Sequence, residues 1–172
     1  TGIESYVDNI SQLFNQHFHP TLAQLHLSKP SIGYFQNLIF NSLVIALLLC
    51  RRNHWNATTT QQLLCGIFSW FICHQHHVEK LFGKTDDQSE LSEQKKVLYA
   101  KLTAYLANHK REIWMAALTA VDKQSLLTQM SHLTLPNYRC KSSLFVAIAL
   151  NLGLSCTRND RTKVLSFAHS IK

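Results

Sequence analysis

The sequence predicts an all-α fold, a single compact domain of about seven to nine helices over residues 1–172. The 172 residues include only five glycines and three prolines, which is few for the many turns of an all-β protein. Apolar residues recur three and four positions apart, as on one helix face, and no segment alternates like a strand. A hydrophobic content of 46% can fill the core of one domain. Because the chain begins at Thr1, we expect a fragment of a longer protein.

Three helices are expected before residue 53. Apolar side chains at helical spacing predict the first, and they are Ile3, Val7, Ile10, Leu13 and Phe14. A short second helix begins at Pro20, because proline is favoured in a first turn, and Pro30 separates it from the third. The third runs from about Ser31 to Arg52 and is apolar nearly all round its middle. We therefore expect it at the centre of the domain.

The fourth helix follows a turn at residues 53–56. Thr58 and Gln61 form a capping-box pattern at its start, and it continues to about Phe82, where Gly83 can end it. Within it, Trp70 is expected in the core. Trp55, in the preceding turn, is expected to cover the core as a lid, and the alternative is that it anchors a partner.

The remaining helices follow a polar loop over Lys84–Ser89. Ser89 or Ser92 caps a fifth helix whose apolar residues are Val97, Leu98, Leu102 and Leu106. Further helices are expected over Ile113–Val121, Ser125–Leu133, Ser142–Leu154 and Arg158–Ser170, with a break at Pro136-Asn137. The Ser142–Leu154 helix is strongly apolar and is expected to be buried.

The cysteines and the apolar segments indicate a cytoplasmic protein without membrane insertion. The five cysteines are odd in number and show no Cys-x-x-Cys spacing. Cys50, Cys65 and Cys73 lie in apolar runs, so we expect buried free thiols in a reducing compartment. The most apolar segment, Ile39–Cys50, has 12 residues, whereas a membrane span needs about 20.

Positive charge is concentrated near the carboxyl terminus. The net charge is +7, and residues 139–172 alone carry a net +5. The basic residues proposed as a ligand surface are Arg139, Lys141, Arg158, Arg161 and Lys163. Such a face is typical either of a solvated helix or of a surface that binds a nucleotide, such as a cyclic dinucleotide. Nucleic-acid binding has less support, because Tyr138 is the one aromatic residue close enough to stack on bases.

A second cluster of interest is Cys73-His74-Gln75-His76-His77. His74 and His77 are three residues apart and therefore share a helix face. With Cys73 they are weak candidates for a metal site, because a structural zinc site usually has four ligands. The alternative is a polar helix end, where the helix dipole favours cations.

Three blocks of the chain resemble the HD superfamily of metal-dependent phosphohydrolases, most closely the HD-GYP branch. Asn41–Leu48 is similar to a central helix that reads His-Ser-x-x-Val-Ala in the family. Thr59–His74 matches a helix that ends in the family's Leu-Leu-His-Asp metal motif, here Phe-Ile-Cys-His. Glu90–Glu93 is similar to the Leu-Thr-x-Glu start of the next helix, and Phe145–Ala149 weakly resembles a late Val-Ala-x-Ala helix. The resemblance implies an HD-like bundle, and active HD-GYP members hydrolyse cyclic di-GMP.

The chain departs from this family at the positions of its metal ligands. Asn41 replaces the first histidine, Cys73-His74 replaces His-Asp, and no histidine stands near Lys101. The His-His-Glu and Gly-Tyr-Pro signatures are absent, and Leu150 or Asn151 takes the place of the final aspartate. A binuclear site needs several carboxylate and imidazole ligands to hold its ions and activate water. The resemblance therefore implies a degenerate, non-catalytic member of the family.

Three functional hypotheses follow. The first is a non-catalytic HD-GYP-like domain that serves as a protein-interaction or regulatory module in bacterial signalling, without a cofactor. The second is nucleotide or nucleic-acid binding through the carboxyl-terminal basic face. The third is a metal-dependent phosphohydrolase with unorthodox ligands from Cys73, His74, His76 and His77. The expected partner is another protein, and an exposed helix face could also pair two copies in a homodimer.

Overall fold

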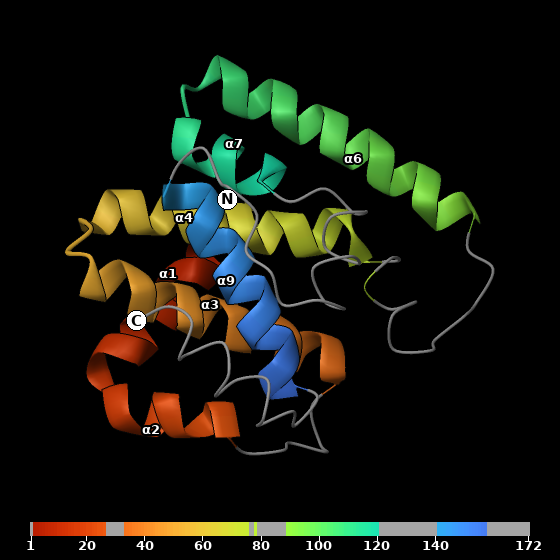
Figure 1. Ribbon diagram of the computed structural model, residues 1–172. Helices are drawn as coiled ribbons and strands as arrows, with labels where there is room; N and C mark the ends of the chain where they lie inside the picture. Colours follow the sequence, from red (N-terminus) through yellow and green to blue (C-terminus); the bar gives the residue numbers. More distant parts are fainter. Residues whose placement is uncertain (1, 27–32, 76–77, 79–88, 121–140, 158–172) are drawn as a thin grey trace.

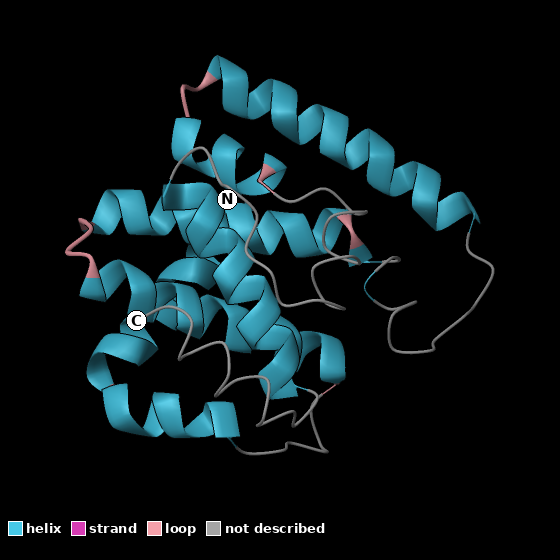
Figure 2. Cartoon of the chain, viewed as in Figure 1, coloured by secondary structure: helices cyan, strands magenta, loops and turns pink. Residues whose placement is uncertain are grey.

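The computed structural model describes residues 2–26, 33–75, 78, 89–120 and 141–157. These residues form seven α-helices and one short 3-10 helix (Figure 1). No strand occurs among them, and loops join the helices (Figure 2). The all-α prediction is confirmed for this part of the chain. The helices expected over Ser125–Leu133 and Arg158–Ser170, and the break at Pro136-Asn137, lie outside the described residues.

Two tightly packed helix pairs organise the fold. The first pair is α3 (Tyr34–Arg52) with α9 (Lys141–Thr157), and the second is α4 (Ala57–Cys73) with α7 (Glu112–Thr119). In Figure 1, α9 crosses in front of α3. Leu43, Val44 and Ala46 of α3 are fully buried, which confirms the central place predicted for this helix.

Three further helices surround these pairs. α1 (Gly2–Gln16) packs on α4 and α3, and α2 (Phe18–Ala23) follows it directly. α6 (Ser89–Asn108) contacts α7 and α4 and lies along the edge of the fold opposite α2 (Figure 1). The 3-10 helix Gln24–His26 contacts α2 and α9.

Several helix starts differ from the predictions. α2 begins at Phe18, two residues before Pro20, because the first-turn N–H groups of a helix have no intrahelical acceptor and proline costs nothing there. α3 begins at Tyr34 after Gly33, later than the predicted Ser31. α4 begins at Ala57, and its N-cap is Asn56 instead of Thr58: the Asn56 side chain accepts a 2.8 Å hydrogen bond from the Thr59 N–H.

The end of α4 also differs from the prediction. The helix ends at Cys73 and not near Phe82, because His74 leaves helical geometry at φ −109° and ψ 15°. The expected terminator Gly83 lies outside the described residues. The carbonyl of Trp70 accepts the backbone N–H of His74 at 3.0 Å and also contacts its ring Nδ1 at 2.9 Å. Both contacts hold the residue in a turn.

The tryptophans and thiols lie where the sequence placed them. Trp70 is 1% exposed, and half-buried Trp55 stacks on Phe145 with ring centroids 4.8 Å apart, as a lid would. Cys50, Cys65 and Cys73 are buried free thiols.

One described segment has the length and apolarity of a membrane span. It is Phe35–Arg52 of α3, and 61% of it is buried inside the fold. The core helix of a globular protein passes the same test of length and composition, so the absence of membrane insertion stays a prediction.

Candidate functional site

The crossing of α3 and α9 holds the first position at which the HD resemblance places a metal ligand. Asn41 is 6% exposed, and its Nδ2 donates a 3.0 Å hydrogen bond to Oγ1 of Thr157. The Thr157 hydroxyl in turn donates to the Gly153 carbonyl at 2.7 Å. The amide of Asn41 is therefore part of a hydrogen-bonded chain that joins the two helices.

The two helices approach each other closely at Ser42, the residue after Asn41. A Cβ added at Gly153 would overlap the Ser42 hydroxyl and lie 3.0 Å from the Ser42 Cα. The Ser42 Oγ is fully buried and has no hydrogen-bond partner in the described part of the fold. Glycine is required here for close helix packing.

Asn151 and Leu150, the two positions that the HD resemblance aligns with a final aspartate, also lie on α9. Asn151 of α9 is 6% exposed, and its Nδ2 donates to the Ala147 carbonyl one turn earlier at 2.8 Å. The alternative position, Leu150, is 2% exposed and belongs to the hydrophobic core. Neither side chain supplies an anionic ligand, and the amide donor of Asn151 is already bonded within its own helix.

The Cys73-His74 pair lies at the end of α4, next to α6. The His74 ring stacks on Trp70 with centroids 4.6 Å apart and meets the edge of Tyr99 at 6.1 Å. Because a carbonyl oxygen only accepts hydrogen bonds, the contact with Trp70 O requires the hydrogen on Nδ1. Coordination of a metal would therefore have to use Nε2.

The thiol of Cys73 is buried at the end of α4. Burial raises its pKa, which the positive charge of Lys95 lowers only in part. The thiolate is the form that binds metal, so a raised pKa weakens a cysteine as a ligand. Within the described ranges, no group of three or more His, Cys, Asp or Glu side chains could hold a metal ion. His76 and His77 lie outside those ranges, so the metal hypothesis stays a hypothesis.

The proposed basic face is largely outside the described residues. Arg139, Arg158, Arg161 and Lys163 lie in undescribed segments, and Lys141 is described only as the first residue of α9. Binding of a nucleotide through this face therefore stays a prediction.

The structure reveals one surface that sequence reasoning missed, on α6. Val97 and Leu98 were named with Leu102 and Leu106 as the apolar residues of this helix, and they are 47% and 39% exposed. Leu106 is 1% exposed, and Val97 precedes it by nine residues, which at 3.6 residues per turn is about 180° around the helix. The spacing of Val97 and Leu106 in the sequence is therefore a signal that could have placed Val97 away from the core.

A search of protein-family models, curated proteins and solved structures found no match to this chain.

Proposed function

We propose that this chain is a non-catalytic, HD-GYP-like helical domain that serves as a protein-interaction or regulatory module in bacterial signalling. The observation that carries the proposal is the hydrogen bond from Asn41 to Thr157, at the position where the resemblance places the first metal ligand. There a catalytic member would need an imidazole directed at an ion. The side chain present is instead used to join α3 to α9.

The surroundings of the other aligned positions support the same proposal. The Cys73 thiol is buried and has a raised pKa, and the Asn151 amide is bonded within its own helix. Activation of water at neutral pH by a binuclear site depends on anionic and imidazole ligands close together. Asn41, Cys73 and Asn151 present two amides and a buried thiol.

The exposed apolar side chains of α6 support the interaction role. Val97, Leu98 and Tyr105 are each more than one third exposed, at 47%, 39% and 41%. Contiguous apolar surface on a globular protein is typical of a site that another protein covers.

A metal-uptake experiment with matched variants tests the non-catalytic part. The tag-free chain and the Cys73→Ser/His74→Ala double variant would be incubated with Mn²⁺, desalted and measured by elemental analysis. We expect background metal in both proteins. One or two ions per chain in the parent, lost in the double variant, would contradict the proposal and support the unorthodox metal site.

A double-mutant cycle tests the structural role of Asn41. Asn41→Ala and Thr157→Val each remove one side of the hydrogen bond and are expected to lower the free energy of unfolding. Removal of one partner from a buried hydrogen bond costs about 1–3 kcal/mol. The double variant should lose less than the sum of the singles, because both remove the same bond. Strictly additive effects would mean that the two side chains do not stabilise the crossing together.

A further inference from the structure

The helix α6 carries several exposed apolar side chains. α6 has 20 residues, so it is about 30 Å long. Its inner side carries buried Leu106 with half-buried Tyr99 and Leu102, which pack against the core. Among the described residues, three of the five exposed large hydrophobic side chains belong to α6, with Val97 opposite Leu106 and the other two on one flank. They are Val97, Leu98 and Tyr105.

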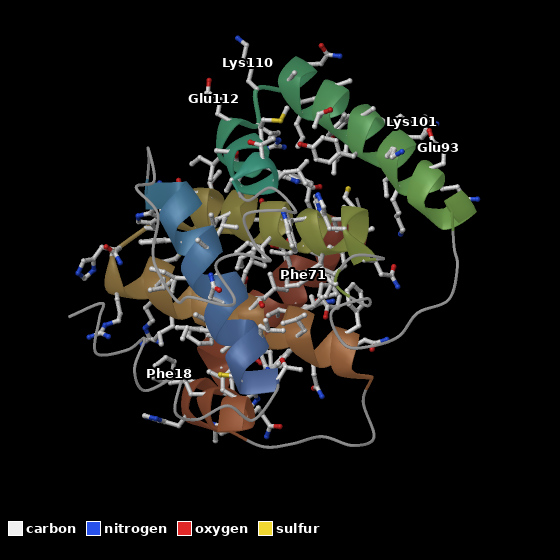
Figure 3. All side chains as sticks on the ribbon, turned by 45° about the vertical axis from the view of Figure 1, so that its right-hand side comes forward. Phe18, Phe71, Glu93, Lys101, Lys110 and Glu112 are labelled. Atoms are coloured by element: carbon white, nitrogen blue, oxygen red, sulfur yellow. The ribbon has the colours of Figure 1, made fainter. Side chains whose placement is uncertain are left out.

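Charges of opposite sign lie on either side of the centre of this surface. Glu93 and Lys101 are each four residues from Val97, so the three share one helix face. Both charged side chains are exposed and lie on the side of α6 away from α4 and α7 (Figure 3). Glu93 forms a 3.1 Å ion pair with Lys96, and both side chains are about 70% exposed. Such a solvated pair is weak and can exchange partners.

We infer that this face of α6 binds the same face of a second copy of the chain, with the two helices antiparallel. The inference deepens the proposed function and rests on it, since it names the partner of the interaction module. A two-fold interface must be self-complementary, and this face has acidic and basic residues placed symmetrically about an apolar centre. Parallel pairing would instead place like charges at the same level.

Antiparallel pairing centred on Val97 brings opposite charges of the two copies to the same level. Val97 of one copy faces Val97 of the other, and Glu93 of each lies level with Lys101 of its partner. Four residues correspond to about 6 Å along the helix axis. Each Glu93–Lys101 pair therefore lies about 6 Å from the two-fold axis, and the two pairs are about 12 Å apart. Leu98 and Tyr105, about 100° and 80° around the helix from Val97, flank this contact on one side. Antiparallel helix dipoles attract each other.

The size of the face predicts a weak, reversible dimer. A standard interface buries about 800 Å² on each partner, and one face of a 30 Å helix supplies less than a large obligate interface does. We therefore expect association that depends on protein concentration between about 10 µM and about 1 mM.

Charge exchange across α6 tests the arrangement. Sedimentation equilibrium would be measured for the full chain, for Glu93→Lys, for Lys101→Glu and for the Glu93→Lys/Lys101→Glu double variant. Each single variant places like charges level with each other, so its dimerisation should weaken about tenfold or more. The double variant restores opposite charges and should recover the parent's association. An equimolar mixture of the two single variants should also associate, as a heterodimer.

Two controls keep the outcomes distinct. Arg52→Glu changes the net charge as much as Lys101→Glu does, but at the exposed end of α3, and should leave association unchanged. Circular dichroism shows whether each variant stays folded. A parent that is monomeric up to about 1 mM, or a dimer indifferent to both α6 charges, would overturn the inference. Metal uptake on the same samples reports separately on the non-catalytic proposal, so either can fail alone.

Discussion

The indole N–H of Trp114 donates a 3.0 Å hydrogen bond to the hydroxyl of Ser69, and this bond connects α7 to α4. Both residues are buried, with 2% and 1% of their surface exposed. The Ser69 hydroxyl donates in turn to the Cys65 carbonyl at 2.7 Å. One serine thus satisfies the single polar group of a large aromatic side chain inside an apolar interface.

Ser69→Ala is expected to destabilise the fold by about 1–3 kcal/mol, because it leaves the Trp114 N–H buried without an acceptor. Urea unfolding followed by circular dichroism measures the change. Trp114→Phe removes the donor itself, so Ser69→Ala in that background should lower the free energy of unfolding by clearly less. Equal costs in the two backgrounds would show that the hydrogen bond contributes nothing.

The contact between α3 and α9 predicts opposite effects for two small substitutions. Gly153→Ala should destabilise by about 1–3 kcal/mol, because its Cβ overlaps the Ser42 hydroxyl and the helices must move apart. Ser42→Ala should be neutral or stabilising, because it removes a buried hydroxyl without a described partner. Gly2→Ala is the control, since an added Cβ there meets nothing within 4 Å. Thermal unfolding of the three variants checks the order, and a stabilised Gly153→Ala protein would contradict it.

The fold class and the central helix were predictable because they depend on apolar content that persists over whole helices. Leu43–Leu47 has no polar side, so α3 could only be buried. The helix ends were less predictable, because they depend on single side chains. The sequence around Asn56 and Thr58 allows either to cap α4, and the hydrogen bond to Thr59 N decides for Asn56.

The N-cap of α4 provides a direct test of that detail. Asn56→Ala should lower the free energy of unfolding by about 0.5–2 kcal/mol, whereas Asn56→Asp and Asn56→Ser should retain most of the stability. Thr58→Ala should have a smaller effect, because the side chain of Thr58 is not the cap. Chemical denaturation of the four variants checks this, and a larger loss for Thr58→Ala than for Asn56→Ala would restore the original assignment.

Two buried thiols predict how stability responds to alkaline pH. Burial raises the pKa of Cys50 and of Cys65 from 9.0 to about 12. A hydrogen bond with Thr60 lowers the pKa of Cys50 in part, whereas the charges of Glu4 and Asp8 raise the pKa of Cys65 further. In the unfolded chain the thiols lose their protons near pH 9, while the folded chain keeps them. The stability that they provide is therefore complete below pH 9 and is lost as pH rises toward 12, with a slope of about 1.4 kcal/mol per pH unit for each thiol.

The Cys50→Ala/Cys65→Ala variant isolates this contribution from that of other groups that titrate above pH 9. Its free energy of unfolding should fall less steeply than that of the parent between pH 9 and 11. Parallel curves for the two proteins would show that the thiols ionise equally well in the folded state.

The candidate site was harder to predict than the fold, for a physical reason. Asn41 and Thr157 are 116 residues apart, and no local pattern indicates that they form a hydrogen bond. The importance of Asn41 was a prediction from the HD resemblance, which aligns it with a ligand histidine. The exposure of Val97 could have been found from the sequence, because nine residues place it about 180° around the helix from buried Leu106.

Hydrolysis of cyclic di-GMP is the measurement that tests the central claim most directly. The tag-free chain would be assayed with added Mn²⁺ or Fe²⁺, beside an active HD-GYP phosphodiesterase as a positive control. A non-catalytic interaction module predicts no product above the protein-free background under either metal. Turnover that is lost on chelation and restored by metal would contradict the account and would identify a working metal centre in this chain.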